Sequence, residues 1–373
     1  PDMASMIHNE MRKHGIKLVL GYTVEGFKEK DNGVEVLLKD NPSLQADMVV
    51  LAIGVTPDTV LAKEAGLELG IKESIVVNDR METSVPDIYA AGDAVQVKHY
   101  VTGNDALISL AGPANKQGRI IADNICGGDS RYLGSQGSSV IKVFDMTAAT
   151  TGINETNAKK SGLEVDTVIL SPMSHAGYYP GGKVVTMKVV FEKETYRLLG
   201  AQIIGYEGVD KRIDVLATAI HAGLKATQLK DLDLAYAPPY SSAKDPVNMA
   251  GFMIDNIAKG TLKQWHLENL DKICKDKSAV LLDVRTVGEF NRGHMDGFKN
   301  IPVDELRERI NEIEKGKPVY LICQSGLRSY IASRILEGNG YETYNFSGGF
   351  RFYDAVVNDR ALIERAYACG IDY

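Results

Sequence analysis

The sequence predicts an α/β protein built from several domains. The chain has 373 residues, which corresponds to two or three domains at about 150 residues each. Its first and last parts alternate apolar strands with helical patterns, which is typical of parallel sheets covered by helices. Its middle part has several strands in succession, which predicts an α+β domain.

In the first part, an amphipathic helix opens the chain and three strands follow, at residues 16–20, 34–38 and 48–53. The third is a continuous apolar run, as in a strand buried on both faces. It ends at Gly54, and a helix around Leu61 comes next. A strand that breaks at glycine into a helix places backbone N–H groups where nucleotides bind, although an ordinary turn has the same pattern.

A second predicted strand that ends at a glycine carries a more specific functional signal. Residues 83–93 read T-x-x-P-x-I-Y-A-A-G-D, with a short strand at 88–91 that leads to Gly92 and Asp93. Glycine lets a ligand approach the backbone, and the carboxylate accepts hydrogen bonds from hydroxyl groups. This pattern predicts a site for a sugar-like polyol. A long helix is expected over 107–126, with Ala111 near its start.

The middle part is predicted to hold strands at 138–144, 164–170, 183–191 and 198–206. A helix containing Ile213 follows, and Asp245 with Pro246 marks the start of another. Two loops rich in tyrosine, proline and glycine lie at 175–182 and 236–246. Tyrosines on such fixed loops suit a site for a thiolate or a flavin edge, but residue chemistry alone favours packing at a dimer interface.

The last part alternates strands at 280–284, 319–323 and 342–345 with helices at 287–292, 304–310 and 328–338. Cys323 ends a buried strand, and a tight loop and a helix follow it. Loop N–H groups and a helix N-terminus stabilise a thiolate, and Arg328 adds a fixed cation. The loop context favours a nucleophile over a small buried side chain.

Composition excludes several classes of protein. The formal net charge of −7 argues against nucleic acid and anionic membranes as partners. The longest apolar run, residues 48–55, is far shorter than the ~20 residues of a membrane-spanning helix, and no signal peptide opens the chain. We therefore expect a cytoplasmic protein. The 4 cysteines and 7 histidines show no metal-binding spacing, and Cys126, Cys274 and Cys369 are interpreted as structural.

The motif ending at Asp93, preceded by the strand ending at Gly54, resembles the flavoprotein disulfide reductases with two dinucleotide-binding domains. The resemblance implies that Asp93 binds the ribityl chain of FAD and that NADH or NADPH is the reductant. It places Gly54, Gly92, Ala111 and Tyr236 at the cofactor. The chain has no G-x-G-x-x-G motif. We therefore expect it to lack the first FAD half, the redox cysteine and the first nicotinamide half.

The two tyrosine loops resemble those of the coenzyme A disulfide reductase and NADH oxidase branch. This resemblance implies a homodimer in which Tyr178 and Tyr236 reach toward the redox cysteine and flavin, with Tyr179 and Tyr240 as close competitors. It also implies that coenzyme A binds at two further residues, Asn115 and Lys244.

The last part resembles rhodanese-like domains, with the loop C-x-x-x-x-R. The resemblance implies that Cys323 carries sulfane sulfur as a persulfide, with Arg328 beside it, and that Asp283 and Arg285 brace the loop. The substrate would contact the four residues between cysteine and arginine, which are Gln324, Ser325, Gly326 and Leu327. Four intervening residues favour sulfur over phosphate as the substrate atom.

We therefore predict an α/β fold composed of a partial two-dinucleotide-binding-domain flavoprotein, an α+β dimerisation domain and a rhodanese-like domain. The expected parts are 1–68 (nicotinamide-binding), 69–135 (FAD-binding), 136–260 (dimerisation) and 261–373 (rhodanese-like). The function this implies is NAD(P)H-dependent reduction of a coenzyme A disulfide, persulfide or polysulfide, coupled to sulfur transfer. The alternatives are an NADH oxidase or peroxidase with an appended sulfurtransferase, and a dimeric scaffold carrying an independent rhodanese.

Overall fold

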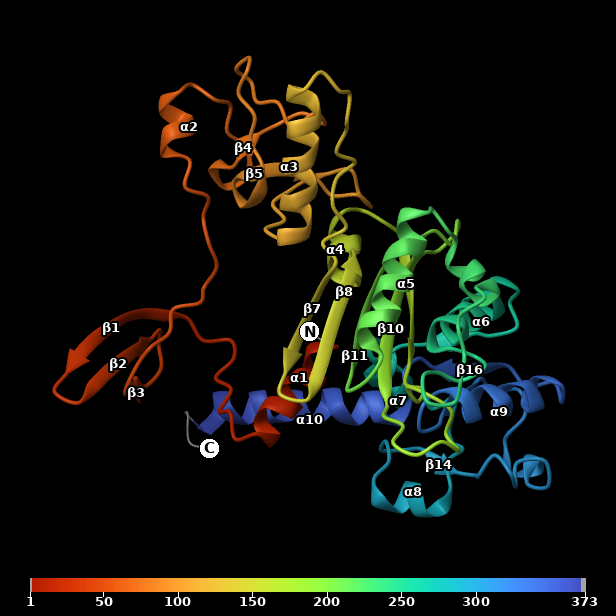
Figure 1. Cartoon of the computed structure of the whole chain (residues 1–373). Helices are drawn as coiled ribbons and strands as arrows, with labels where there is room; N and C mark the ends of the chain where they lie inside the picture. The colour runs from red at the N-terminus through yellow and green to blue at the C-terminus, as the bar shows by residue number, and fades with distance from the viewer. Residues whose placement is uncertain (1, 370–373) are drawn as a thin grey trace. The chain divides into compact units, whose positions relative to one another are not determined.

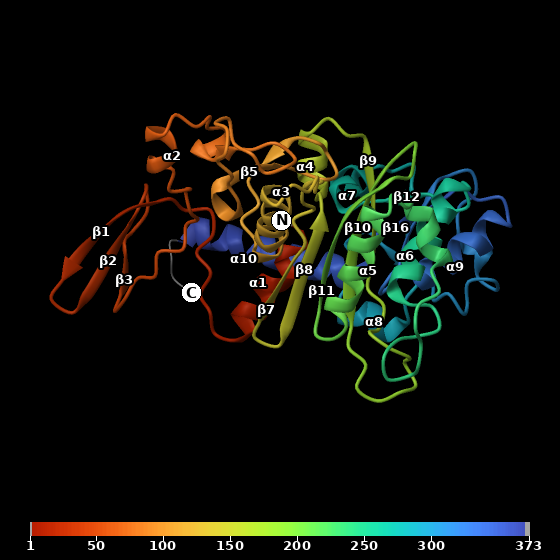
Figure 2. The same ribbon diagram turned by 45° about the horizontal axis from the view of Figure 1, so that its top comes forward.

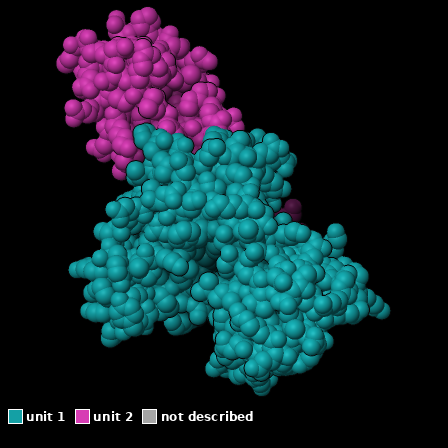
Figure 3. Space-filling view, turned by 90° about the vertical axis from the view of Figure 1, so that its right-hand side faces the viewer, with its two compact units in different colours: residues 1–20, 140–150, 154–373 teal, residues 21–139, 151–153 magenta. Residues whose placement is uncertain are grey.

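The computed structural model describes residues 2–369, with side chains for residues 2–364 (Figure 1). It divides into two compact units, which Figure 3 distinguishes by colour. One unit comprises residues 1–20, 140–150 and 154–373, and the other comprises residues 21–139 and 151–153. No helix among the described residues is long and apolar enough to cross a membrane.

The smaller unit contains two three-stranded sheets. The first, in the order β1-β2-β3, is formed by β1 (Val24–Lys30), β2 (Gly33–Leu38) and β3 (Leu44–Ala46). The second, in the order β4-β5-β6, is formed by β4 (Ile75–Val76), β5 (Val95–Lys98) and β6 (Asp105–Ala106). Its helical elements are α2 (Val60–Glu64), η1 (Ile71–Glu73), η2 (Gly92–Ala94) and α3 (Ala111–Ile125). Met81, Val95 and Val97 form its buried core.

Three strands predicted in the first part are not formed. Residues 16–20 and 48–53 lie outside regular structure, and the predicted strand at 88–91 makes only an isolated bridge between Tyr89 and Glu82. A buried strand needs hydrogen-bonded neighbours on both sides. The described residues place none beside 48–53, and the side chains of Val50 and Ile53 are accordingly 78% and 85% exposed.

The larger unit contains a five-stranded sheet of order β7-β8-β11-β10-β9, in which β10 runs antiparallel to both neighbours. Its strands are β7 (Ser139–Val143), β8 (Met146–Gly152), β9 (Val165–Leu170), β10 (Val185–Glu192) and β11 (Leu198–Gly205). Its helices are α4 (Glu155–Lys160), α5 (Val209–His221), η3 (Ala226–Asp231) and α6 (Pro246–Ala258). The four strands predicted here are present, and β8 is an additional one.

The same unit holds a second sheet, parallel throughout, of order β12-β16-β15-β13-β14. Its strands are β12 (Gln264–Trp265), β13 (Val280–Asp283), β14 (Lys299–Asn300), β15 (Val319–Ile322) and β16 (Thr343–Phe346). Its helical elements are η4 (Leu267–Asn269), α7 (Leu270–Lys275), α8 (Val287–Arg292), η5 (Ile310–Glu312), α9 (Leu327–Glu337) and α10 (Gly349–Cys369).

The helix predicted over 304–310 is wrong. Residues 303–308 form consecutive turns, and only the short η5 follows at Ile310. The amides of Glu305 and Leu306 bond to the carbonyls of Pro302 and Val303, three residues back, instead of starting an i−4 ladder. Such i−3 bonds belong to the tighter 3-10 conformation, which forms only short segments.

The two sheets of the larger unit share one apolar core. Ile169 and Ile204 of the first sheet belong to the same buried cluster as Trp265, Phe346 and Phe352 of the second. The opening helix α1 (Ala4–Lys13), which the sequence predicts, packs on α10 (Figure 2). The parallel sheet is therefore fixed to its neighbour by packing.

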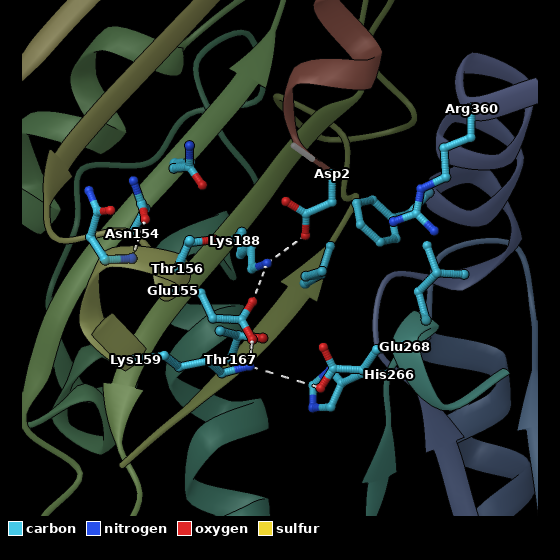
Figure 4. A pocket seen from close by; sticks show the side chains of 15 residues that line it. Asp2, Asn154, Glu155, Thr156, Lys159, Thr167, Lys188, His266, Glu268 and Arg360 are labelled. Carbon is cyan, nitrogen blue, oxygen red and sulfur yellow. Dashed lines mark hydrogen bonds and ion pairs between the residues drawn. The ribbon is translucent and has the colours of Figure 1, made fainter. Parts of the chain in front are cut away.

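A polar pocket also lies at this junction (Figure 4). Lys188, 4% exposed, bonds to Asp2 at 2.5 Å and to Glu155 at 2.6 Å. Burial alone would lower the pKa of Lys188, but the two carboxylates raise it above its ordinary value. Asp166 of β9 pairs with His266 at 3.0 Å, and this pair links the first sheet to the segment that follows β12.

Candidate functional site

Cys323 lies where β15 ends and α9 begins. Gly326 is the N-cap of α9 in the left-handed region, at φ +99°, and this turn aims its own backbone N–H at the sulfur. The Gly326 N–H lies 3.1 Å from Sγ, and the Ser329 hydroxyl donates to Sγ at 3.2 Å. Together with the N-terminus of α9 these donors stabilise negative charge on a sulfur that is 1% exposed.

The start of α10 makes hydrogen bonds to the backbone of the Cys323 loop. The amides of Phe350 and Arg351 donate to the carbonyls of Cys323 and Gln324 at 2.8 and 3.2 Å. Gly349 has φ +70°, and a Cβ there would lie 2.7 Å from the Gln324 carbonyl oxygen. Only glycine allows this approach, so Gly349 fixes the curvature of the loop.

Asp283 and Arg285 form a buried pair beside the loop, 0% and 1% exposed. The Arg285 guanidinium bonds to both Asp283 oxygens, donates to the Gly293 carbonyl at 2.7 Å and lies 3.8 Å from the centre of the Phe350 ring. These contacts hold Arg285 against Asp283, the Gly293 carbonyl and the Phe350 ring. They are the contacts of a structural brace, as the resemblance implies.

Arg328 does not present a bare cation to the sulfur. Its guanidinium makes two hydrogen bonds to Glu289 of α8, both at 2.7 Å. These bonds lower the pKa of Glu289 to about 2. Thr286 adds bonds to the same carboxylate in a capping box, so a neutral clasp links α8 to the loop. The sequence analysis did not identify Glu289 as the partner of Arg328.

The structure brings Tyr178 and Tyr236 together. Their hydroxyl groups are hydrogen-bonded at 2.8 Å, and this bond raises the pKa of Tyr236. Both rings are exposed, 77% and 46%. The two alternative tyrosines are not part of this pair. Tyr179 packs edge-on against His175, and the exposed Tyr240 makes no bond to Tyr178 or Tyr236.

A buried ion pair connects the two tyrosine loops, and sequence reasoning missed it. Arg212 of α5 bonds to Asp245, the N-cap of α6, and donates to the Ser174 carbonyl at 2.7 Å. Asp245 also accepts from Ser241 at 2.6 Å. Burial alone would raise the pKa of Asp245, but Arg212 lowers it. Because Ser174 and Ser241 lie in different loops, Arg212 fixes one relative to the other.

In the smaller unit, η2 lies against α3. The amide of Gly92 donates to Gln117 at 2.7 Å. Gly92 has φ +83°, and a Cβ there would meet its nearest neighbour only at 3.8 Å, so this face of the backbone is open to a ligand. The Asp93 carboxylate is exposed and has no ion-pair partner among the described residues. This arrangement fits the hydroxyl-bearing chain of FAD.

The other predicted site residues of the smaller unit are exposed. Ala111 begins α3, one turn before Asn115, and both are exposed. The Asn115 amide donates back to the Ala111 carbonyl at 3.0 Å. Gly54 has φ +103° in an exposed segment, and a Cβ added there would meet no atom within 4 Å. In the larger unit, Lys244 is exposed beside Asp245.

Cys126 and Cys274 are exposed free thiols, and Cys369 lies outside the residues whose side chains are described. Burial raises the pKa of Cys274, as do nearby carboxylates. No group of ligand-type side chains in residues 2–364 is arranged for a metal ion. Cys323 is therefore the described cysteine with the setting of a nucleophile.

Three family models match the chain. Residues 1–118 match the pyridine nucleotide-disulphide oxidoreductase model, residues 138–246 match the dimerisation domain of that family, and residues 266–355 match the rhodanese-like domain. A relative from Pyrococcus abyssi, named NAD(P)H sulfur oxidoreductase (CoA-dependent), is 36% identical over 246 residues, which are 66% of this chain and 54% of the relative. The chain spans about half the length of the curated relatives it matches.

Two solved structures are similar over nearly the whole chain. Reduced CoADR-RHD of Bacillus anthracis has 46% identity and a TM-score of 0.92, covering 96% of this chain and 64% of that one. A NAD-dependent persulfide reductase from A. fulgidus has 40% identity and a TM-score of 0.86, covering 94% and 64%. Fold and loop define a multidomain α/β protein with a rhodanese-like domain, as predicted. The chain belongs to the pyridine nucleotide-disulphide oxidoreductase family.

Proposed function

We propose that Cys323 is a sulfur carrier in an FAD-dependent oxidoreductase that uses NAD(P)H to reduce coenzyme A-type disulfides, persulfides or polysulfides. The observation that carries the proposal is the pair of donors at Sγ, the Gly326 amide and the Ser329 hydroxyl, at the N-terminus of α9. The names of the relatives support the same sulfur chemistry.

The sulfur transfer follows from the loop. The Cys323 thiolate attacks the sulfane sulfur of a donor, the donor's sulfur–sulfur bond breaks, and its electron pair leaves with the donor. The cysteine then holds a persulfide, whose negative charge the loop amides stabilise. A thiol or cyanide attacks the outer sulfur and regenerates the thiolate. The Arg328–Glu289 clasp holds the loop during both steps.

FAD, when bound, supplies two-electron transfer between a nicotinamide and a disulfide. Gly92 and Asp93 would hold its hydroxyl-bearing chain, with Ala111 and Gly54 as further contacts. Tyr178 and Tyr236 would donate hydroxyl hydrogen bonds at the reacting sulfur. Lys244 and Asn115 would bind the coenzyme A substrate. These assignments extend the resemblance of the two loops and of the motif ending at Asp93.

We further propose a cytoplasmic homodimer. The match to the dimerisation model supports the oligomeric state. Free thiols at three described cysteines, Cys126, Cys274 and Cys323, support a reducing compartment. The domain limits we propose are those of the sequence, 1–68, 69–135, 136–260 and 261–373. Analytical ultracentrifugation measures the subunit number.

The sulfur-transfer step is tested on the purified chain by thiosulfate:cyanide sulfurtransferase activity. Cys323→Ser is expected to reduce turnover to background, while Cys274→Ser, which changes an exposed thiol outside the loop, stays within twofold of wild type. Full activity of Cys323→Ser would refute the proposal.

The oxidoreductase part is tested on the complete gene product. A bound flavin spectrum and NAD(P)H oxidation that depends on coenzyme A persulfide or disulfide are expected. Oxidation driven by oxygen alone would identify an NADH oxidase instead. A colourless protein with sulfurtransferase activity would identify a scaffold carrying an independent rhodanese.

A further inference from the structure

The Ser329 hydroxyl, which donates to the Cys323 sulfur, has a second acceptor within reach. Its Oγ lies 3.2 Å from Sγ and 3.1 Å from the carbonyl oxygen of Gly326. A serine hydroxyl carries one proton, so it serves one of these two acceptors at a time. Ser329 is fully buried and Cys323 is 1% exposed, so bulk water does not replace this donor. Whether the sulfur receives the proton therefore depends on what else binds the Gly326 carbonyl.

Two N–H groups already donate to the Gly326 carbonyl. The Tyr330 amide donates to it at 3.1 Å and makes the first i−4 hydrogen bond of α9. The side-chain Nδ2 of Asn345 donates to it at 3.2 Å. A carbonyl oxygen has two lone pairs, and these two donors fill both of them. The Ser329 proton is thereby left for the sulfur.

Asn345 reaches the loop from the strand beside β15. It lies on β16, where it pairs with Leu321 of β15, and it is 2% exposed. Its Nδ2 faces the Gly326 carbonyl, because a carbonyl accepts only from a donor. Its Oδ1 is buried and has no hydrogen-bond partner among residues 2–364. A buried acceptor without a donor destabilises the fold, and an apolar side chain would avoid that loss, so the value of this asparagine lies in its Nδ2 contact.

We infer that Asn345 is a positioning residue for sulfur transfer: by holding the Gly326 carbonyl, it directs the Ser329 proton to the Cys323 sulfur. The hydrogen bond from Ser329 then stabilises the negative charge of the thiolate before it attacks a sulfur donor. No bond forms or breaks at Asn345 itself, which acts through Gly326 and Ser329. This inference rests on the proposed sulfur transfer at Cys323.

The test follows how alkylation of Cys323 by iodoacetamide depends on pH, read by mass spectrometry from the peptide that carries this cysteine. Alkylation reports the thiolate, because the thiolate is the nucleophile. Asn345→Leu frees one lone pair of the Gly326 carbonyl, and the Ser329 proton turns to it. The midpoint of alkylation should rise by about one pH unit, and thiosulfate:cyanide turnover at neutral pH should fall about tenfold. Asn345→Ala, which adds no volume, should have the same effect.

A double variant shows whether Asn345 acts through Ser329. Ser329→Ala alone should raise the alkylation midpoint by a similar amount. Adding Asn345→Leu to it should raise the midpoint no further, because no hydroxyl proton is left to redirect. A rise in the double variant equal to the sum of the two single rises would overturn the inference. The charged pairs beside the loop stay the same in every variant, and they are Arg328 with Glu289 and Arg285 with Asp283.

Thr343→Val is the matched control on the same strand. Thr343 lies two residues before Asn345, so both side chains project from the same face of β16. The Thr343 hydroxyl donates to Glu337 at the C-terminal end of α9, at 2.8 Å. Its loss removes a buried hydrogen bond away from the loop and should leave the alkylation midpoint unchanged. An equal rise in Thr343→Val, or no rise in Asn345→Leu and Asn345→Ala, would overturn the inference. Full cyanide turnover in Cys323→Ser would instead refute the sulfur transfer itself.

Discussion

The buried pair Arg212–Asp245 offers a quantitative test of how the tyrosine loops are held. The side chains are 1% and 4% exposed. Arg212→Met keeps the aliphatic volume and removes the charge. It leaves the Asp245 carboxylate with Ser241, the Val247 amide and the more distant Lys211 ammonium as partners. It also removes the donors to the Gly208 and Ser174 carbonyls, which lie at 2.9 and 2.7 Å.

Breaking a buried pair from one side costs about 3–5 kcal/mol, because a charge stays buried without compensation. We therefore expect Arg212→Met to lower the free energy of unfolding by about 3–5 kcal/mol, measured by urea denaturation with circular dichroism. Lys211→Met is the matched control. Its side chain is 42% exposed and its ammonium lies 4.0 Å from Asp245, so the loss should stay below about 1 kcal/mol.

A second variant isolates the cause. Arg212→Met combined with Asp245→Asn removes the uncompensated charge, and it should recover a large part of the lost stability. Proteolysis within the 175–182 and 236–246 loops should follow the same order of variants. Equal losses in Arg212→Met and Lys211→Met would refute the reasoning, as would a double variant no more stable than the single one.

Three shorter predictions concern the loop around the nucleophile. Glu289→Gln should make the free energy of unfolding depend less on pH in acid. Arg328 lowers the pKa of Glu289 to about 2, so the stabilisation from this carboxylate is full above about pH 4.5 and is lost as pH falls toward 2. Denaturation measured at a series of acidic pH values will show the difference. Ser329→Ala removes one donor to the sulfur, worth about 1.5–3 kcal/mol, and should reduce sulfurtransferase turnover about tenfold or more. Gly349→Ala should abolish that turnover, whereas Gly316→Ala, at φ +81° with open space around it, should leave turnover unchanged.

Sequence reasoning found the Cys323 loop because its chemistry is local. The strand end, the glycine turn and the helix start occupy consecutive residues, and their hydrogen bonds span 3 to 6 positions. It also found Tyr178 and Tyr236 one by one. Their mutual hydrogen bond spans 58 positions and depends on how two loops fold back, which no local pattern encodes.

Strand prediction succeeded where a strand has neighbours. In β10, Val189 and Val190 pair on both sides and lie fully buried, so apolarity and structure agree. The equally apolar run at 48–53 has no paired neighbour among the described residues, and it stays irregular and exposed. The opposite failure is β8, whose threonines and alanines gave little hydrophobic signal but which pairs between β7 and β11. Whether each segment forms a strand depends on its pairing partners, which the residues of that segment alone do not reveal.

Helix α6 connects the two chemistries of the larger unit. Its N-cap, Asp245, belongs to the ion pair that fixes the tyrosine loops, and its Met253 lines a cavity together with Gly326 and Leu327 of the Cys323 loop. The helix cannot shift easily, because Asn248 donates to the Leu229 and Leu232 carbonyls at 3.0 and 2.9 Å. Any side chain at Gly251 would strike the backbone of η3. A helix fixed in this way holds the Tyr236 loop and the side chains beside the Cys323 loop in constant register.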